Sequence, residues 1–145
     1  QPAAEQALAD FYQRWQNTPL VVDLWLSLQA GSVVEGTLNK VKKLLTHAAF
    51  DIKNPNKVRA LIAAFCMQNS AQFHAEDGSG YEFLATQIIA LDKLNPQIAA
   101  RLINPLSRYQ KFDKRRQQLM KDQLQRILAE PDLSKDSYEI ASKSL

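Results

Sequence analysis

Residues 54–65 read NPNKVRALIAAF, and forty-one residues later residues 95–106 read NPQIAARLINPL. Each stretch opens with Asn-Pro, a typical helix start. The Asn side chain can cap a free backbone N–H, and proline loses no hydrogen bond at the first helical position. Apolar side chains then recur along one helix face. Because a separation of roughly forty residues is typical of HEAT and armadillo repeats, the two stretches indicate equivalent helices in successive helix pairs.

The remainder of the sequence has the same helical period, without strand-like alternation. We predict helices over residues 2–16, 19–30, 34–46, 55–69, 79–93, 96–109, 112–129 and 134–144. The expected N-caps are Thr18, Asn54, Asn95 and Ser134, and Pro105 is expected to kink or split the sixth helix. Short connections favour antiparallel neighbours. The predicted fold class is therefore all-α, with antiparallel helix hairpins stacked as a HEAT- or armadillo-like superhelical layer.

The 145 residues fit one helical domain, over residues 1–145, with an ordinary apolar share of 46%. The longest apolar run, LIAAFCM at residues 61–67, is far too short to cross a bilayer, and no secretory signal is visible. We therefore expect no membrane partner and a cytoplasmic location. The single cysteine, Cys66, is expected to be a buried structural thiol. Since the chain opens with Gln1 rather than Met, it can be a piece of a longer protein.

The net charge of +3 is concentrated in one segment. Residues 111–121, KFDKRRQQLMK, hold five basic side chains against one acidic side chain. A nucleic-acid surface normally carries basic residues over a wider area, with aromatic or polar side chains among them. Leu119, Met120 and Leu124 lie at helical spacing, so we interpret the charges as the solvated face of an amphipathic helix. No nucleic-acid partner is expected.

Residues 73–83, FHAEDGSGYEF, permit two hypotheses. His74, Glu76 and Asp77 are potential ligands of a divalent cation. The glycines that follow indicate instead a turn into the next helix, with Ser79 as its N-cap and the acids near the positive helix end. The turn accounts for more of the stretch, so no metal site is predicted. This interpretation assigns a structural turn-and-cap role to His74, Glu76, Asp77, Gly78, Ser79, Gly80 and Tyr81.

Two arginines lack an obvious local partner. Arg59 and Arg101 each lie in the second turn of an Asn-Pro helix, among apolar or small residues. An arginine near a helix N-terminus gains nothing from the helix dipole. The compensating partner is either a carboxylate within the fold, such as Asp77, or an anionic group outside it. The sequence leaves these two alternatives open.

The sequence contains no motif of a complete active site. The histidines are His47 and His74, twenty-seven residues apart, whereas a His-Glu-x-x-His zinc motif needs two within one helical turn. A nucleophile elbow, a phosphate loop and a dinucleotide fingerprint are also missing from it. We therefore predict no catalytic residue and no cofactor in this chain.

One long stretch resembles a known family. Residues 54–102, which contain FHAEDGSGY and LDKLNPQIAARL, are similar to the C-terminal domain of bacterial aminopeptidase N, a gluzincin zinc metallopeptidase. The resemblance continues upstream through GTLNKVKKLLTH and downstream through YQKFDKRRQQLM. It therefore covers most or all of the chain.

The resemblance implies that the chain is one domain of a larger enzyme that removes N-terminal amino acids from peptides. In that family one zinc ion and the His-Glu-x-x-His motif belong to a separate catalytic domain, so this chain alone should be inactive. The helical domain closes over the active site, where Arg59 and Arg101 are expected to face the substrate channel. Its expected partners are the catalytic and other domains of the same polypeptide, together with peptide substrates.

The architecture also permits a free-standing helical-repeat scaffold that binds a partner protein, because a fold does not fix a function. The reading frame upstream of Gln1 distinguishes the two hypotheses. A His-Glu-x-x-His motif encoded there favours the enzyme, and a start codon immediately before Gln1 favours the scaffold.

Overall fold

The computed structural model describes residues 2–145, and none of these residues lies in a β-strand. The elements in chain order are α1 (Pro2–Trp15), α2 (Pro19–Ala30), α3 (Thr37–Leu44), α4 (Pro55–Val58), the π-helix η1 (Arg59–Gln68), α5 (Ser70–Phe73), α6 (Ser79–Asp92), α7 (Pro96–Leu102), α8 (Asn104–Ser107), the 3₁₀-helix η2 (Tyr109–Lys111), α9 (Lys114–Leu128) and α10 (Lys135–Ser144). The predicted all-α class is confirmed.

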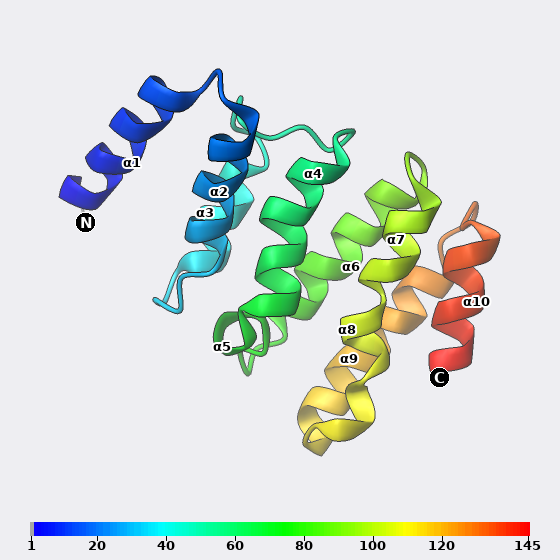
Figure 1. Cartoon of the computed structure of the whole chain (residues 1–145). Helices are drawn as coiled ribbons and strands as arrows, with labels where there is room; N and C mark the ends of the chain where they lie inside the picture. The colour runs from blue at the N-terminus through cyan, green and yellow to red at the C-terminus, as the bar shows by residue number, and fades with distance from the viewer. Residues whose placement is uncertain (1) are drawn as a thin grey trace.

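The helices form two rows, with α1 at one end and α10 at the other (Figure 1). One row holds α2, α4–η1 and α7–α8, and the other holds α3, α6 and α9. The rows are joined where α2 packs on α3 and where α6 packs on both η1 and α7, and α10 packs on α7 and α9. This stack of helix pairs confirms the predicted armadillo-like layer, in which α4 and α7 begin successive pairs.

Of the N-caps predicted at Thr18, Asn54, Asn95 and Ser134, the last three are confirmed. The side-chain oxygens of Asn54, Asn95 and Ser134 accept backbone N–H groups in the first turns of α4, α7 and α10, at 3.0, 3.3 and 3.2 Å. The prediction for Thr18 is wrong, because its side chain makes no capping hydrogen bond. The helix still begins directly after it, since Pro19 already has the backbone angle that the first helical position requires.

The helix predicted over residues 34–46 is shorter in the structure, where α3 begins at Thr37. Gly36, its N-cap, has a φ of 91°, in the left-handed region that glycine adopts without steric cost. A right-handed helix therefore cannot extend back through this position. The Thr37 hydroxyl donates to the carbonyl of Val34 at 2.6 Å and fixes the turn.

The helix predicted over residues 55–69 is divided between α4 and η1, and the short helix α5 that follows it was not predicted. Asn69 causes the break. Its side-chain nitrogen donates to the carbonyls of Ala30 and Ser32 at 2.9 and 2.7 Å, and its side-chain oxygen accepts from the backbone N–H of Gln72. This buried amide therefore joins the end of α2 to the start of α5.

The predicted helix over residues 96–109 is split after α7, as Pro105 suggested. Proline has no N–H to donate within a helix, and here the chain continues as the separate turns α8 and η2. The helices predicted from residues 112 and 134 begin slightly later, at α9 and α10. Asp113 and Ser134 cap these two helices and so lie outside them.

One hydrophobic core runs between the two rows. Its largest fully buried side chains include Tyr81, Phe65 and Phe73. The Phe73 ring meets the other two edge to face, with ring centroids 5.2 and 6.4 Å apart, an arrangement that aromatic pairs favour. Cys66 is buried in this core, and its burial raises the pKa of the thiol, as expected for a structural cysteine.

At one end of the stack, α1 packs only loosely on α2. α1 contributes no buried residue, and it is held to α2 by a hydrogen bond of 2.9 Å from the Trp25 indole to the carbonyl of Leu8. Phe11 and Trp15 remain exposed on α1. Across residues 2–145, no helix combines the length and the apolar character needed to cross a lipid bilayer.

Candidate functional site

Two neighbouring segments of one row carry basic side chains and no acidic ones. Residues 52–75, which include α4 and η1, hold three Lys or Arg residues and no Asp or Glu. Residues 93–112, which include α7 and α8, hold four Lys or Arg residues and again no acid. We call the exposed side of these helices the basic face; its residues are Asn56, Arg59, Met67, Gln97, Arg101, Asn104 and Arg108. A surface with one sign of charge attracts groups of the opposite sign.

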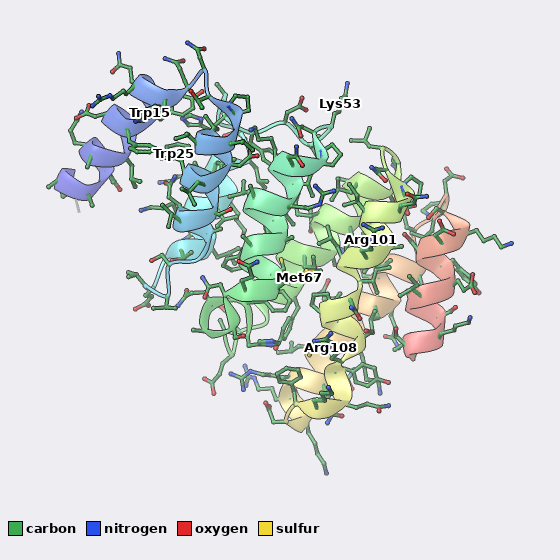
Figure 2. The ribbon with its side chains drawn as sticks, viewed as in Figure 1. Trp15, Trp25, Lys53, Met67, Arg101 and Arg108 are labelled. Atoms are coloured by element: carbon green, nitrogen blue, oxygen red, sulfur yellow. The ribbon has the colours of Figure 1, made fainter. Side chains whose placement is uncertain are left out.

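The α7–α8 part of the basic face is a single line of side chains. Gln97, Arg101, Asn104 and Arg108 are all exposed, and they follow one another along α7, α8 and the residue after α8. Figure 2 shows Arg101 and Arg108 along this line, beside Met67 of η1. The two arginines therefore present their positive charges on the same side of the row.

Arg59 is exposed where η1 begins, and its guanidinium donates to the side-chain oxygen of Asn56 at 2.8 Å. Ion pairs within residues 2–145 include neither Arg59 nor Arg101. Asp77, the suggested internal partner, accepts hydrogen bonds from Ser79 instead. An internal ion pair is therefore the wrong alternative for both arginines, and a role facing a ligand stays a prediction.

A groove of about 300 Å³ opens between the end of η1 and α8. We call it the Arg108 groove; its walls include Met67, Ser70, His74, Asn104, Arg108 and Phe112. It is continuous with the basic face, because Met67, Asn104 and Arg108 belong to both.

His74 is fixed by contacts within the structure. Its Nδ1 lies 2.7 Å from the Tyr81 hydroxyl, and its ring stacks on Phe112 with 4.4 Å between the ring centroids. Burial and the nearby charge of Arg116 lower the pKa of His74. The imidazole is therefore neutral at neutral pH.

Two arginines at the start of α9 hold the turn from the other row. Arg116 Nε donates to the carbonyl of His74 at 3.0 Å, and Arg115 Nε donates to the carbonyl of Glu76 at 3.3 Å. The interpretation of residues 111–121 as a purely solvated face is therefore wrong for these two side chains. These charged hydrogen bonds to backbone carbonyl oxygens stabilise the conformation of the turn.

The helix after the turn begins differently from the prediction. α6 begins at Ser79, so Ser79 is not the N-cap; Gly78 holds that position with a φ of 75°. The capping oxygen comes from Asp77, which accepts from the Ser79 backbone N–H at 2.9 Å and from the Ser79 hydroxyl at 2.6 Å. These two hydrogen bonds lower the pKa of the Asp77 carboxyl. Gly80 and Tyr81 follow in the buried first turn.

The turn residues do not form a ligand set for a metal. Within residues 2–145, no three side chains among His, Cys, Asp and Glu lie close enough together to hold an ion. His74 uses Nδ1 on Tyr81, and Asp77 uses its carboxylate on Ser79. The geometry favours the structural role of the turn, and the absence of a metal site from this chain stays a prediction.

Arg108 and Met67 were not among the predicted site residues. Two signals in the sequence point to Arg108: it lies seven residues after Arg101, on the same helix face, and no acidic residue occurs between Asp92 and Asp113. The exposure of Met67 has no such signal, because it lies in an apolar run that predicts burial.

The sequence matches, over residues 1–145, a family described as "Domain of unknown function (DUF3458_C) ARM repeats". Aminopeptidase N of Haemophilus influenzae is 45% identical over 138 residues, which cover 95% of this chain and 16% of that protein. Aminopeptidase N of Escherichia coli K12 is 42% identical over 144 residues, which cover 99% of this chain and 17% of that protein.

A solved structure is also similar. The crystal structure of Legionella pneumophila aminopeptidase A in complex with aspartic acid superposes with a TM-score of 0.93 at 38% sequence identity. The match covers 99% of this chain and 17% of that one. The chain thus spans about a sixth of the length of these relatives.

Proposed function

The chain belongs to the DUF3458_C family of armadillo-repeat domains, as the C-terminal domain of an aminopeptidase, and from this premise we propose that it covers the active site and guides peptide substrates. The enzyme would remove amino acids from the N-terminus of a peptide, with the bond-breaking groups on the rest of the polypeptide. This domain would bind and orient the part of the peptide that is not being cut.

The observation that supports this role is the pair of exposed arginines on a face without acidic residues. Arg59 and Arg101 have no ion-pair partner within residues 2–145, so their N–H groups can donate to a ligand. A peptide offers backbone carbonyls and a terminal carboxylate, which arginine binds well. The positive field of the basic face would also orient a peptide with its negative end toward this domain.

The zinc ion that the family resemblance implies would be held outside this chain. Zinc sites need three or four nitrogen, sulfur or oxygen ligands converging on one point. Residues 2–145 offer no such group, so the residues present do not fit the ion. The contribution of this domain is limited to binding peptide and excluding water and bulky substrates.

Replacing Arg59 and Arg101 together by glutamine in the complete enzyme is expected to lower kcat/KM for tetrapeptides by about tenfold, because charge-assisted hydrogen bonds and steering are lost. The same change should alter kcat/KM for an aminoacyl-p-nitroanilide by less than about twofold, because such a substrate has no distal carboxylate. Steady-state kinetics with both substrates measure the difference.

Arg14→Gln is the matched control, since Arg14 is exposed on α1, over the Trp15 ring, and lies outside the basic face. It should leave both rates unchanged. An equal loss on peptide and p-nitroanilide substrates in the double variant would contradict the guiding role, because a general loss of activity does not depend on peptide length.

A further inference from the structure

The Arg108 groove has one charged group in its wall. Arg108 is exposed, and within residues 2–145 it forms no ion pair. Among residues 2–145, no Asp or Glu lines the groove. His74, the other titratable polar side chain of the wall, is neutral because burial and Arg116 lower its pKa. The groove therefore carries a net positive charge, which is complementary to a single anionic group.

Hydrogen-bond donors lie beside this charge. The Ser107 hydroxyl donates to the Asn104 backbone carbonyl at 2.7 Å and lies 3.3 Å from the Asn104 side-chain oxygen, so the side-chain N–H groups of Asn104 are not used in this contact. Within the described part of the chain, neither those N–H groups nor the Ser70 hydroxyl makes a hydrogen bond. A carboxylate can accept from several donors at once, and arginine binds it in a bidentate geometry.

The remaining wall is apolar and firmly held. Phe112 is stacked on His74, and Pro105 is part of α8, so neither can move far from its place. Met67 is half exposed at the edge, with a flexible side chain that can adapt to different shapes. The volume of about 300 Å³ is at the small end for a ligand site. It fits one amino-acid residue rather than a longer segment.

We propose that the Arg108 groove binds the C-terminal residue of a peptide, with Arg108 and Asn104 holding its main-chain carboxylate and Met67, Pro105 and Phe112 contacting an apolar side chain. The inference rests on the proposed function for its ligand class, since that function brings peptides to the basic face. It adds a selectivity: peptides with a free, unmodified C-terminus and an apolar last residue are favoured. No covalent step is involved.

The test is an NMR titration of this 145-residue chain, which measures binding without catalysis. The probes are N-acetyl-Ala-Ala-Leu as the free acid, the same peptide as its C-terminal amide, and N-acetyl-Ala-Ala-Asp amide. The free acid is expected to shift the Met67 methyl and His74 ring signals and to bind about fivefold or more tightly than either amide. Arg108→Gln should abolish that preference, and Arg14→Gln should preserve it.

Three results would overturn the proposal. The Leu acid could bind no more tightly than its own amide, or no more tightly than the Asp amide, or Arg108→Gln could bind the Leu acid with the affinity of the wild type. Arg108 is exposed and has no ion pair among the residues that the structure describes, so its replacement should leave the dispersion of the spectrum unchanged. Arg108→Lys keeps the charge but not the bidentate fork, and it should restore part of the affinity. Failure of this titration leaves the kinetic test of Arg59 and Arg101 unaffected, so the two proposals can fail separately.

Discussion

Alanine in place of Gly80 is expected to lower the free energy of unfolding by about 3 kcal/mol or more, a large share of the stability of a small domain. A Cβ at this position would overlap the carbonyl oxygen of Phe73 and lie 2.9 Å from its carbonyl carbon. These are backbone atoms of α5, in the buried centre of the core, so no side-chain rotation can relieve the overlap. Urea unfolding followed by circular dichroism measures the change.

Gly36→Ala is the matched control for this prediction. Gly36 also has a special conformation, with a φ of 91°, but no atom lies within 4 Å of a Cβ built on it. Its replacement should therefore lower the free energy of unfolding only by the strain of a left-handed backbone, about 1 kcal/mol. If Gly80→Ala were no more destabilising than Gly36→Ala, then α5 and α6 would not approach each other as closely as the structure has them.

The second large effect is expected at Asp92, a buried carboxylate at the end of α6. It accepts from the Ser134 backbone N–H at 2.7 Å and from the hydroxyls of Ser134 and Ser137, both at 2.6 Å. These groups form the N-terminus of α10, whose positive dipole end also favours a negative charge. Asp92→Ala removes the acceptor and leaves buried donors unpaired, which is expected to cost about 3 kcal/mol.

The contribution of Asp92 should depend on pH. Burial alone raises the pKa of the Asp92 carboxyl, but the hydrogen bonds from Ser134 and Ser137 outweigh it, so the pKa lies below its ordinary value. The unfolded chain then binds the proton more readily than the folded chain. The stabilisation is complete above the unfolded pKa of about 4 and is lost as the pH falls through the lower folded value.

Urea titrations of the wild type, Asp92→Asn and Asp92→Ala between pH 7 and pH 3 measure this dependence. The difference in stability between the wild type and Asp92→Asn should shrink as the pH falls below about 4, because the amide does not titrate. Asp132→Ala removes an exposed acid from the loop between α9 and α10, and it should change stability by less than about 0.5 kcal/mol. A difference that stayed constant with pH would show that the carboxylate charge has no part in holding α10.

The parts of the fold that the sequence predicted are those fixed by local chemistry. An Asn-Pro pair caps and starts a helix within three residues, so the starts of α4 and α7 could be placed without any other information. The period of apolar residues also depends only on near neighbours. For the same reason Pro105 correctly indicated a break in the sixth predicted helix.

The parts that were missed depend on contacts between residues far apart in the chain. Asn69 ends η1 because its amide bonds to carbonyls 37 and 39 residues earlier, and Asp92 holds α10 from 42 and 45 residues away. Arg116 reaches the carbonyl of His74 over a similar separation of 42 residues. A local pattern cannot distinguish these side chains from solvated ones, because the partner is supplied by the next helix pair.

The candidate site also contains residues that local chemistry identifies and residues that depend on contacts far apart in the chain. Arg59 and Arg101 were identified because a cation near a helix N-terminus is locally unfavourable, an argument that needs no partner. For Arg101 this argument fails in the structure: α7 ends at Leu102, so Arg101 lies in its last turn, where the helix dipole favours a cation. The Arg108 groove could not be predicted in this way, since its walls come from η1, α5 and α8 and meet only when the two helix pairs stack.

The absence of buried residues from α1 has a consequence for the motions of the chain. In a stack of repeats each unit is stabilised by its neighbours, so a terminal helix that contributes no buried residue can separate at little cost in free energy. Amide protons of α1 should therefore exchange with deuterium fastest, and those of α6, which packs on both rows, should exchange only when the whole chain unfolds. Exchange monitored by mass spectrometry would then trace a gradient of protection inward from this end of the molecule.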